Sequence, residues 1–276
     1  MSYFVDILTV LLPVLYALAV TNSIAHFVTQ SDFTRKADRP LLAVTVGAHA
    51  LLLVLTSIEL RRCPMGGIFE AMGLMAFALT SVYFVLSLRT GARPTGILIL
   101  PIAFVLEIFS AAAEPANVGP VDGPVNEALR SIWFNIHVFA AVLGFSALAV
   151  SFVHGVFYLY LYRQIKAHRF GLFFRRLPPL AVLKRMTETG AIVGWGLLAV
   201  MIGAGVARAL QEGRLKDLHG DPMILVVTGA FALYTIGLAV RYLAGWRGRY
   251  TVYLSVFGFA VLMLSLVFVS SLHGFH

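Results

Sequence analysis

Long apolar runs, separated by short polar segments, follow one another along the whole chain. Eight of them approach or exceed the roughly 20 residues that a helix needs to cross the hydrocarbon core of a bilayer. They cover residues 3–27, 40–60, 66–88, 94–112, 132–162, 190–210, 222–243 and 250–272. The run at 94–112 contains Pro101 and Glu107 and is the least regular. The pattern predicts one all-α domain, a polytopic membrane bundle with four transmembrane helices in 1–112 and four in 130–276.

Composition and charge agree with a membrane protein and indicate its orientation. Charged residues make up 12% of the chain, about half of the roughly 25% found in soluble domains. The net charge is +8, but Lys and Arg gather in the segments after the first, third, fifth and seventh runs, which is a topology signal and not a nucleic-acid surface. We expect these segments in the cytoplasm and both termini outside. Arg61 and Arg62 run against this bias.

Two loops are long enough to contribute to function. The predicted outer loop, 113–131, is rich in Pro and Gly and would cover an outer site. The predicted cytoplasmic loop, 164–189, is basic and contains Phe170, Phe173 and Phe174. This pattern suits a segment that lies on the inner leaflet. The alternative is an ordinary positive-inside loop with some apolar packing.

Two histidines occupy the predicted outer ends of their spans. His137 lies one to two turns inside the fifth span, and His273 lies at the end of the eighth. His137, Gly144 and Ser151 recur at heptad spacing, which marks one packing face, and Ser255 shares a helix face with His273. Two inward-facing neutral imidazoles can ligate one haem iron axially. The alternative is a pair of interfacial histidines that hydrogen-bond to headgroups or loop carbonyls.

Other ionisable side chains within the spans are secondary candidates, because buried charges in a membrane are costly and often functional. His154 and His26 lie near the predicted inner ends of their spans, His49 lies near the middle of the second, and Glu107 lies within the fourth. His49 and Glu107 would suit a small-solute or proton-coupled transporter. The sequence has no HExxH motif or phosphate-binding loop, and its one cysteine, Cys63, cannot form an intrachain disulfide. We therefore predict no catalytic residues.

Four stretches of the second half share their order and spacing with a known family. They are Trp133–Val138 (WFNIHV), Leu177–Thr189 (LPPLAVLKRMTET), Asp221-Pro222 with the apolar run up to Arg241, and Gly245–Phe259 with the following Leu272-His273. Together they resemble the cytochrome c assembly family, which includes the CcsA/ResC and HemX/YpjD-like groups. The resemblance implies a haem-related function in the bacterial inner membrane. It also assigns haem-iron ligation to His137 and His273, with Trp133 and Asp221 as secondary candidates.

Two departures from the family pattern point to the HemX/YpjD-like branch. Haem-delivering members carry W-x-W-D-P, whereas this chain reads LKDLHGDP, and Ala239 stands where they carry a histidine. The first hypothesis is a component of cytochrome c biogenesis that holds or presents haem at the outer face and catalyses nothing alone. Its partners would be the bilayer, haem, and other cytochrome c assembly or haem-synthesis proteins. The alternatives are a HemX-like regulator or scaffold of haem biosynthesis, which would dock through the basic loop, and the transporter.

Overall fold

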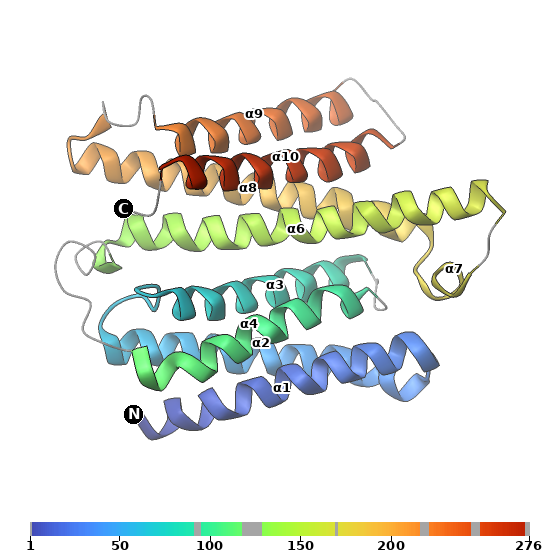
Figure 1. Cartoon of the computed structure of the whole chain (residues 1–276), viewed down its shortest axis with the longest axis horizontal. Helices are drawn as coiled ribbons and strands as arrows, with labels where there is room; N and C mark the ends of the chain where they lie inside the picture. The colour runs from blue at the N-terminus through green and yellow to red at the C-terminus, as the bar shows by residue number, and fades with distance from the viewer. Residues whose placement is uncertain are drawn as a thin grey trace. The chain divides into compact units, whose positions relative to one another are not determined.

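The computed structural model describes residues 2–90, 95–117, 129–168, 171–215, 221–243 and 249–273, and within these ranges it is helical without any strand (Figure 1). The helices are α1 (Ser2–Thr29), α2 (Asp32–Leu60), α3 (Ile68–Thr90), α4 (Gly96–Asn117), α6 (Ile132–Lys166), α7 (Leu172–Arg176), α8 (Leu180–Gln211), α9 (Pro222–Tyr242) and α10 (Tyr250–His273). The all-α prediction is confirmed.

Seven of the described helices are long and apolar enough to cross a membrane, and α4 contributes a shorter apolar stretch, Gly96–Ala112. Their outer faces keep large hydrophobic side chains exposed; Val10 is 74% and Leu264 is 70% accessible. Apolar surfaces of this kind are stable in contact with lipid and unfavourable in contact with water. The chain is thus a multi-pass membrane protein, whereas eight crossings and external termini stay predictions.

Two helices begin well before the apolar runs that predicted them. α2 starts at Asp32 and not near residue 40, because the Ser31 side chain accepts a hydrogen bond from Thr34 N (3.3 Å) and caps the helix. α8 starts at Leu180 and not near residue 190, and its first turns carry Lys184 and Glu188. These polar turns extend beyond the apolar stretch, which is why hydropathy alone missed them.

The chain divides into two compact units, and the first comprises residues 1–135 and 170–179. In it α1 packs on α2 and α4, and α3 packs on α2 and α4. The turn after α2 is held by Arg62, whose guanidinium forms a bidentate pair with Glu70 on α3 (2.9 Å to each oxygen). The side chain of Arg62 is only 6% exposed. This pairing accounts for a cation that opposes the charge bias.

The second unit comprises residues 136–169 and 180–276 and contains α8, α9, α10 and nearly all of α6. Consecutive helices of this unit run in opposite directions (Figure 1). Its core is formed by alanine and leucine side chains with one methionine and one tyrosine: Ala140, Leu148, Ala191, Leu198, Met201, Ala230, Tyr234, Leu254 and Leu262. Both histidines of the predicted haem pair belong to this unit.

Candidate functional site

The face of α6 that the heptad spacing marked packs against α8. A methyl group added at Gly144 would lie 3.2 Å from the nearest side-chain atom of α8. The Ser151 hydroxyl donates to a backbone carbonyl of α8 at 2.7 Å. His137 makes the third contact, through a carbonyl nearer the other end of α8. The predicted packing face is therefore confirmed, and it directs His137 towards its own bundle.

The His137 ring is held in one orientation by α8. Its Nδ1 lies 2.8 Å from the carbonyl oxygen of Met201. A carbonyl only accepts hydrogen bonds, so Nδ1 carries the proton and Nε2 keeps its lone pair. Gly205 permits this approach, because a methyl group there would lie 3.0 Å from Nδ1. Metal-ligating histidines usually show this arrangement, with one ring nitrogen donating to a carbonyl and the other free for the metal.

His273 is the last residue of α10, and its side chain lies outside the described part of the chain. The helix itself can be aligned with α6 by its contacts. The rings of Phe152 and Phe259 are 5.3 Å apart, and a methyl group at Gly155 would meet Val256 at 2.8 Å. The contact of α10 moves back by three residues when the contact of α6 moves forward by three, so the two helices are antiparallel. If this register continues towards the start of α6, the final turn of α10 lies level with His137.

His154 is a second buried imidazole of α6, with no exposed surface. Its Nδ1 donates to the carbonyl oxygen of Val150, one turn earlier in the same helix (2.6 Å). Its Nε2 is buried and has no hydrogen-bond partner among the described residues. His154 therefore offers an imidazole lone pair in the bundle interior, although no other His, Cys, Asp or Glu of the described chain completes a three-ligand metal cluster there.

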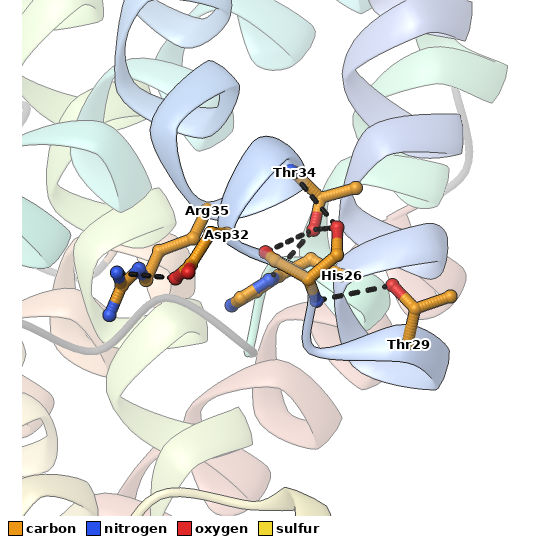
Figure 2. Close-up of polar contacts among 6 residues, drawn as sticks. His26, Thr29, Asp32, Thr34 and Arg35 are labelled. Carbon is orange, nitrogen blue, oxygen red and sulfur yellow. Dashed lines mark hydrogen bonds and ion pairs between the residues drawn. The ribbon is translucent and has the colours of Figure 1, made fainter.

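His26 has a structural environment at the turn between α1 and α2, shown in Figure 2. Its Nδ1 lies 3.1 Å from Thr34 Oγ1, and the Thr34 hydroxyl donates to the Ser31 carbonyl at 2.9 Å. The remaining acceptor capacity of the hydroxyl therefore receives the His26 N–H. Asp32 and Arg35 pair separately within α2. His26 closes the turn that joins the first two helices.

His49 and Glu107, which lie 58 positions apart in the chain, meet inside the first unit. His49 Nδ1 is 3.0 Å from the Tyr16 hydroxyl and 3.7 Å from Glu107 Oε2. All three residues are at most 2% exposed. A neutral imidazole beside a protonated carboxyl group, or an imidazolium beside a carboxylate, is neutral overall, which avoids an uncompensated charge in the membrane interior. The Tyr16 hydroxyl lies within hydrogen-bonding distance of His49 Nδ1, and Glu107 Oε2 lies slightly further away.

The two secondary candidates near the predicted outer ends occupy different environments. Asp221 caps α9, because its Oδ1 accepts a hydrogen bond from Met223 N at 2.8 Å and Pro222 occupies the first turn. Trp133 lies in the first turn of α6 and is half-buried. Most of the outer loop 113–131 lies outside the described residues. The Asp-Pro pair is thus explained by its structural role at the start of α9.

Cys63 lies in the turn between α2 and α3 and is buried as a free thiol. Burial raises its pKa to about 11; the nearby Glu70 carboxylate acts in the same direction, and Arg62 opposes it. The protonated thiol is a poor nucleophile and a poor metal ligand. Cys63 is therefore a structural side chain of this turn.

A sequence profile described as Cytochrome C assembly protein matches residues 65–276, well over half of the chain. The chain belongs to the cytochrome c assembly family. The match starts just before α3, so it includes α3 and α4 and reaches further than the stretches from about 130 that carried the resemblance.

Curated relatives of this family member carry two names. Protein HemX of Bacillus subtilis (strain 168) is 28% identical over 142 residues, which are 51% of either chain. A protein named cytochrome c biogenesis protein CcsA, from Synechococcus sp. (strain JA-3-3Ab), is 29% identical over 140 residues, covering 48% of this chain and 40% of the relative. CcsA of Synechococcus elongatus is 24% identical over 202 residues, covering 71% and 62%. The chain spans about half the length of the curated relatives it matches.

Family-like stretches that are separate in the sequence meet at one end of the second unit. Arg241, which ends the Asp-Pro segment, donates from Nε to Glu188 Oε1 at 3.3 Å, and Lys184 Nζ is 3.8 Å from the same oxygen. Glu188 and Lys184 belong to the LPPLAVLKRMTET stretch. We did not single out these residues as a site from the sequence. The signal available in the sequence was that Glu188 and Arg241 carry opposite charges and lie near the same end of neighbouring antiparallel spans.

Proposed function

We propose that this protein is a haem-handling membrane component of cytochrome c biogenesis. In it, His137 and His273 are the axial ligands of the haem iron, on the outer, non-cytoplasmic side of the membrane. The main support is the hydrogen bond from His137 Nδ1 to Met201, which leaves Nε2 available as a ligand. The α6–α10 register supports the pairing with His273. Family membership and the CcsA names of relatives support the process.

Haem, when bound, would supply the iron that both imidazoles ligate. The residues of this chain bind and orient: α8 fixes the His137 ring, and His273, the last residue of α10, would supply the second imidazole. No catalytic group is required for holding haem and presenting it to a partner. The absent W-x-W-D-P segment and Ala239 favour holding or presenting haem over a complete delivery apparatus.

The haem content of purified variants tests this proposal. We expect His137→Ala and His273→Ala each to lose haem or change the Soret and α/β absorption bands, because one axial bond is removed. His168→Ala is the matched control, since His168 is exposed beyond the end of α6. Unchanged spectra in both ligand variants, or wild-type protein that neither carries nor takes up haem, would contradict the proposal.

A second candidate function, proton-coupled transport of a small solute, is favoured by the buried contact of His49 with Glu107 and Tyr16. In proteoliposomes with a trapped pH dye, Glu107→Gln should abolish solute-driven proton uptake. Glu59→Gln, at an exposed position of α2, is the control. Equal proton movement in wild type, Glu107→Gln and protein-free vesicles would remove this candidate.

A further inference from the structure

Four cations gather where α6 and α9 end and where α8 and α10 begin: two of them share one carboxylate, and the other two lie over one tyrosine ring. Lys184 and Arg241 both contact the same oxygen of Glu188, at 3.8 and 3.3 Å. Arg249 lies over the ring of Tyr162, with 4.2 Å between its Cζ and the ring centroid, and Lys166 Nζ is 5.5 Å from that centroid. We name Lys166, Lys184, Arg241 and Arg249 the four-cation cluster.

Tyrosines join the two halves of this cluster. Tyr158 stacks on Tyr162 with ring centroids 6.5 Å apart, and it lies within electrostatic range of both Arg249 and Glu188. The cation–ring contacts of Tyr162 and the ion pairs of Glu188 are therefore both close to Tyr158. With a single carboxylate among its cations, the four-cation cluster carries an excess of three positive charges over the described residues.

This excess leaves hydrogen-bond donors available. Arg241 uses Nε towards Glu188, whereas a guanidinium has five N–H donors. Arg249 has no carboxylate partner within the described chain. The side chains of Lys184 and Arg241 are 26% and 20% exposed, so they are partly desolvated yet reachable. Partly desolvated cations in excess are stabilised by an anion with several acceptor oxygens.

The position of the cluster selects among possible anions. It lies at the ends of apolar helices, and tyrosines are typical of the interface where lipid headgroups lie. We propose that the four-cation cluster binds the phosphate of an anionic phospholipid, whose acyl chains lie along the apolar faces of the same helices. Basic pockets between transmembrane helices are suited to such headgroups.

Native mass spectrometry of the purified full chain, with added phosphatidylglycerol, cardiolipin or phosphatidylcholine, tests the site. We expect wild-type protein to retain the two anionic lipids and not phosphatidylcholine. Arg241→Gln combined with Arg249→Gln should weaken that retention about 30-fold, because each interfacial cation contributes roughly one kcal/mol. Arg249→Gln alone, which breaks no ion pair, should weaken it about 5-fold and keeps the test valid if the double variant misfolds.

The matched control is Arg35→Gln with Lys36→Gln, which removes the same charge from the start of α2. An equal loss in this control would mean that total charge, and not the cluster, holds lipid. Equal retention of all three lipids, or unchanged retention in the Arg249 variant, would overturn the site. Full competition by inorganic phosphate or by free haem would instead assign the cluster to a soluble anion, and would also overturn the lipid proposal.

Discussion

Gly205→Ala is the substitution that most sharply links the packing of α8 to haem binding. An added methyl group would lie 3.0 Å from His137 Nδ1 and 3.2 Å from Cε1. These distances are tighter than about nine in ten real contacts of a Cβ atom, so the ring must move by a few tenths of an ångström. The 2.8 Å hydrogen bond to Met201 then lengthens or tilts, and Nε2, which would ligate the haem iron, changes its direction.

The magnitude follows from the role of such supporting contacts. Disturbing the hydrogen bond behind a metal-ligating histidine typically costs about 10- to 100-fold in metal affinity, or roughly 1.4 to 2.7 kcal/mol. Gly203→Ala is the matched control, because nothing lies within 4 Å of a methyl group at that position of the same helix. The control should gain up to about 1 kcal/mol of stability, since alanine favours helix over glycine.

The assay is a titration of haem into apoprotein in detergent, followed by the Soret band, with thermal unfolding measured on the same samples. We expect Gly205→Ala to bind haem about 10- to 100-fold more weakly while remaining folded, and Gly203→Ala to bind like wild type. Equal haem affinities for Gly205→Ala and Gly203→Ala would refute the reasoning, because the contact with the His137 ring is the difference between them.

Three further predictions concern the turn after α2 and the orientation of the chain. Glu70→Gln should lower the free energy of unfolding by about 3 kcal/mol, because it leaves buried Arg62 without its carboxylate. Adding Arg62→Met should recover part of this loss. If the effects of the two substitutions on the free energy of unfolding were additive, the pairing would be contradicted. The Cys63 thiol, whose raised pKa of about 11 makes thiolate scarce at neutral pH, should react with maleimide slowly, and faster as pH rises; labelling at the rate of denatured protein would contradict its burial. A reporter fused after His276 should read as external and one within 164–189 as cytoplasmic, and the opposite result would reverse the orientation.

The sequence predicted the helices because an apolar run of sufficient length has few alternatives in a membrane. It did not predict where α2 and α8 begin. Those turns are polar, and they are supported by a cap at Ser31 in α2 and by the i,i+4 pair of Lys184 with Glu188 in α8. Hydropathy measures transfer into lipid and is insensitive to both. Arg62 shows the same limit, since its buried carboxylate partner explains a charge that the topology rule alone did not.

The candidate site was predictable where it lies on one helix and unpredictable where it joins several. Heptad spacing assigned His137 to the packing face of α6, and the contact with α8 agrees. The meeting of His49 with Glu107 required knowing which helices are neighbours. The four-cation cluster likewise combines residues from four segments. Neither arrangement leaves a periodic trace in the sequence.

The most direct measurement of haem ligation by His137 and His273 is electron paramagnetic resonance of the ferric, haem-loaded protein. Two axial imidazoles impose a low-spin iron. We therefore expect a low-spin spectrum in the wild type, a high-spin component in His137→Ala and in His273→Ala, and recovery of the low-spin spectrum when imidazole is added to either variant. A low-spin wild-type spectrum that persists unchanged in both variants would assign the iron to other ligands and contradict the proposed site.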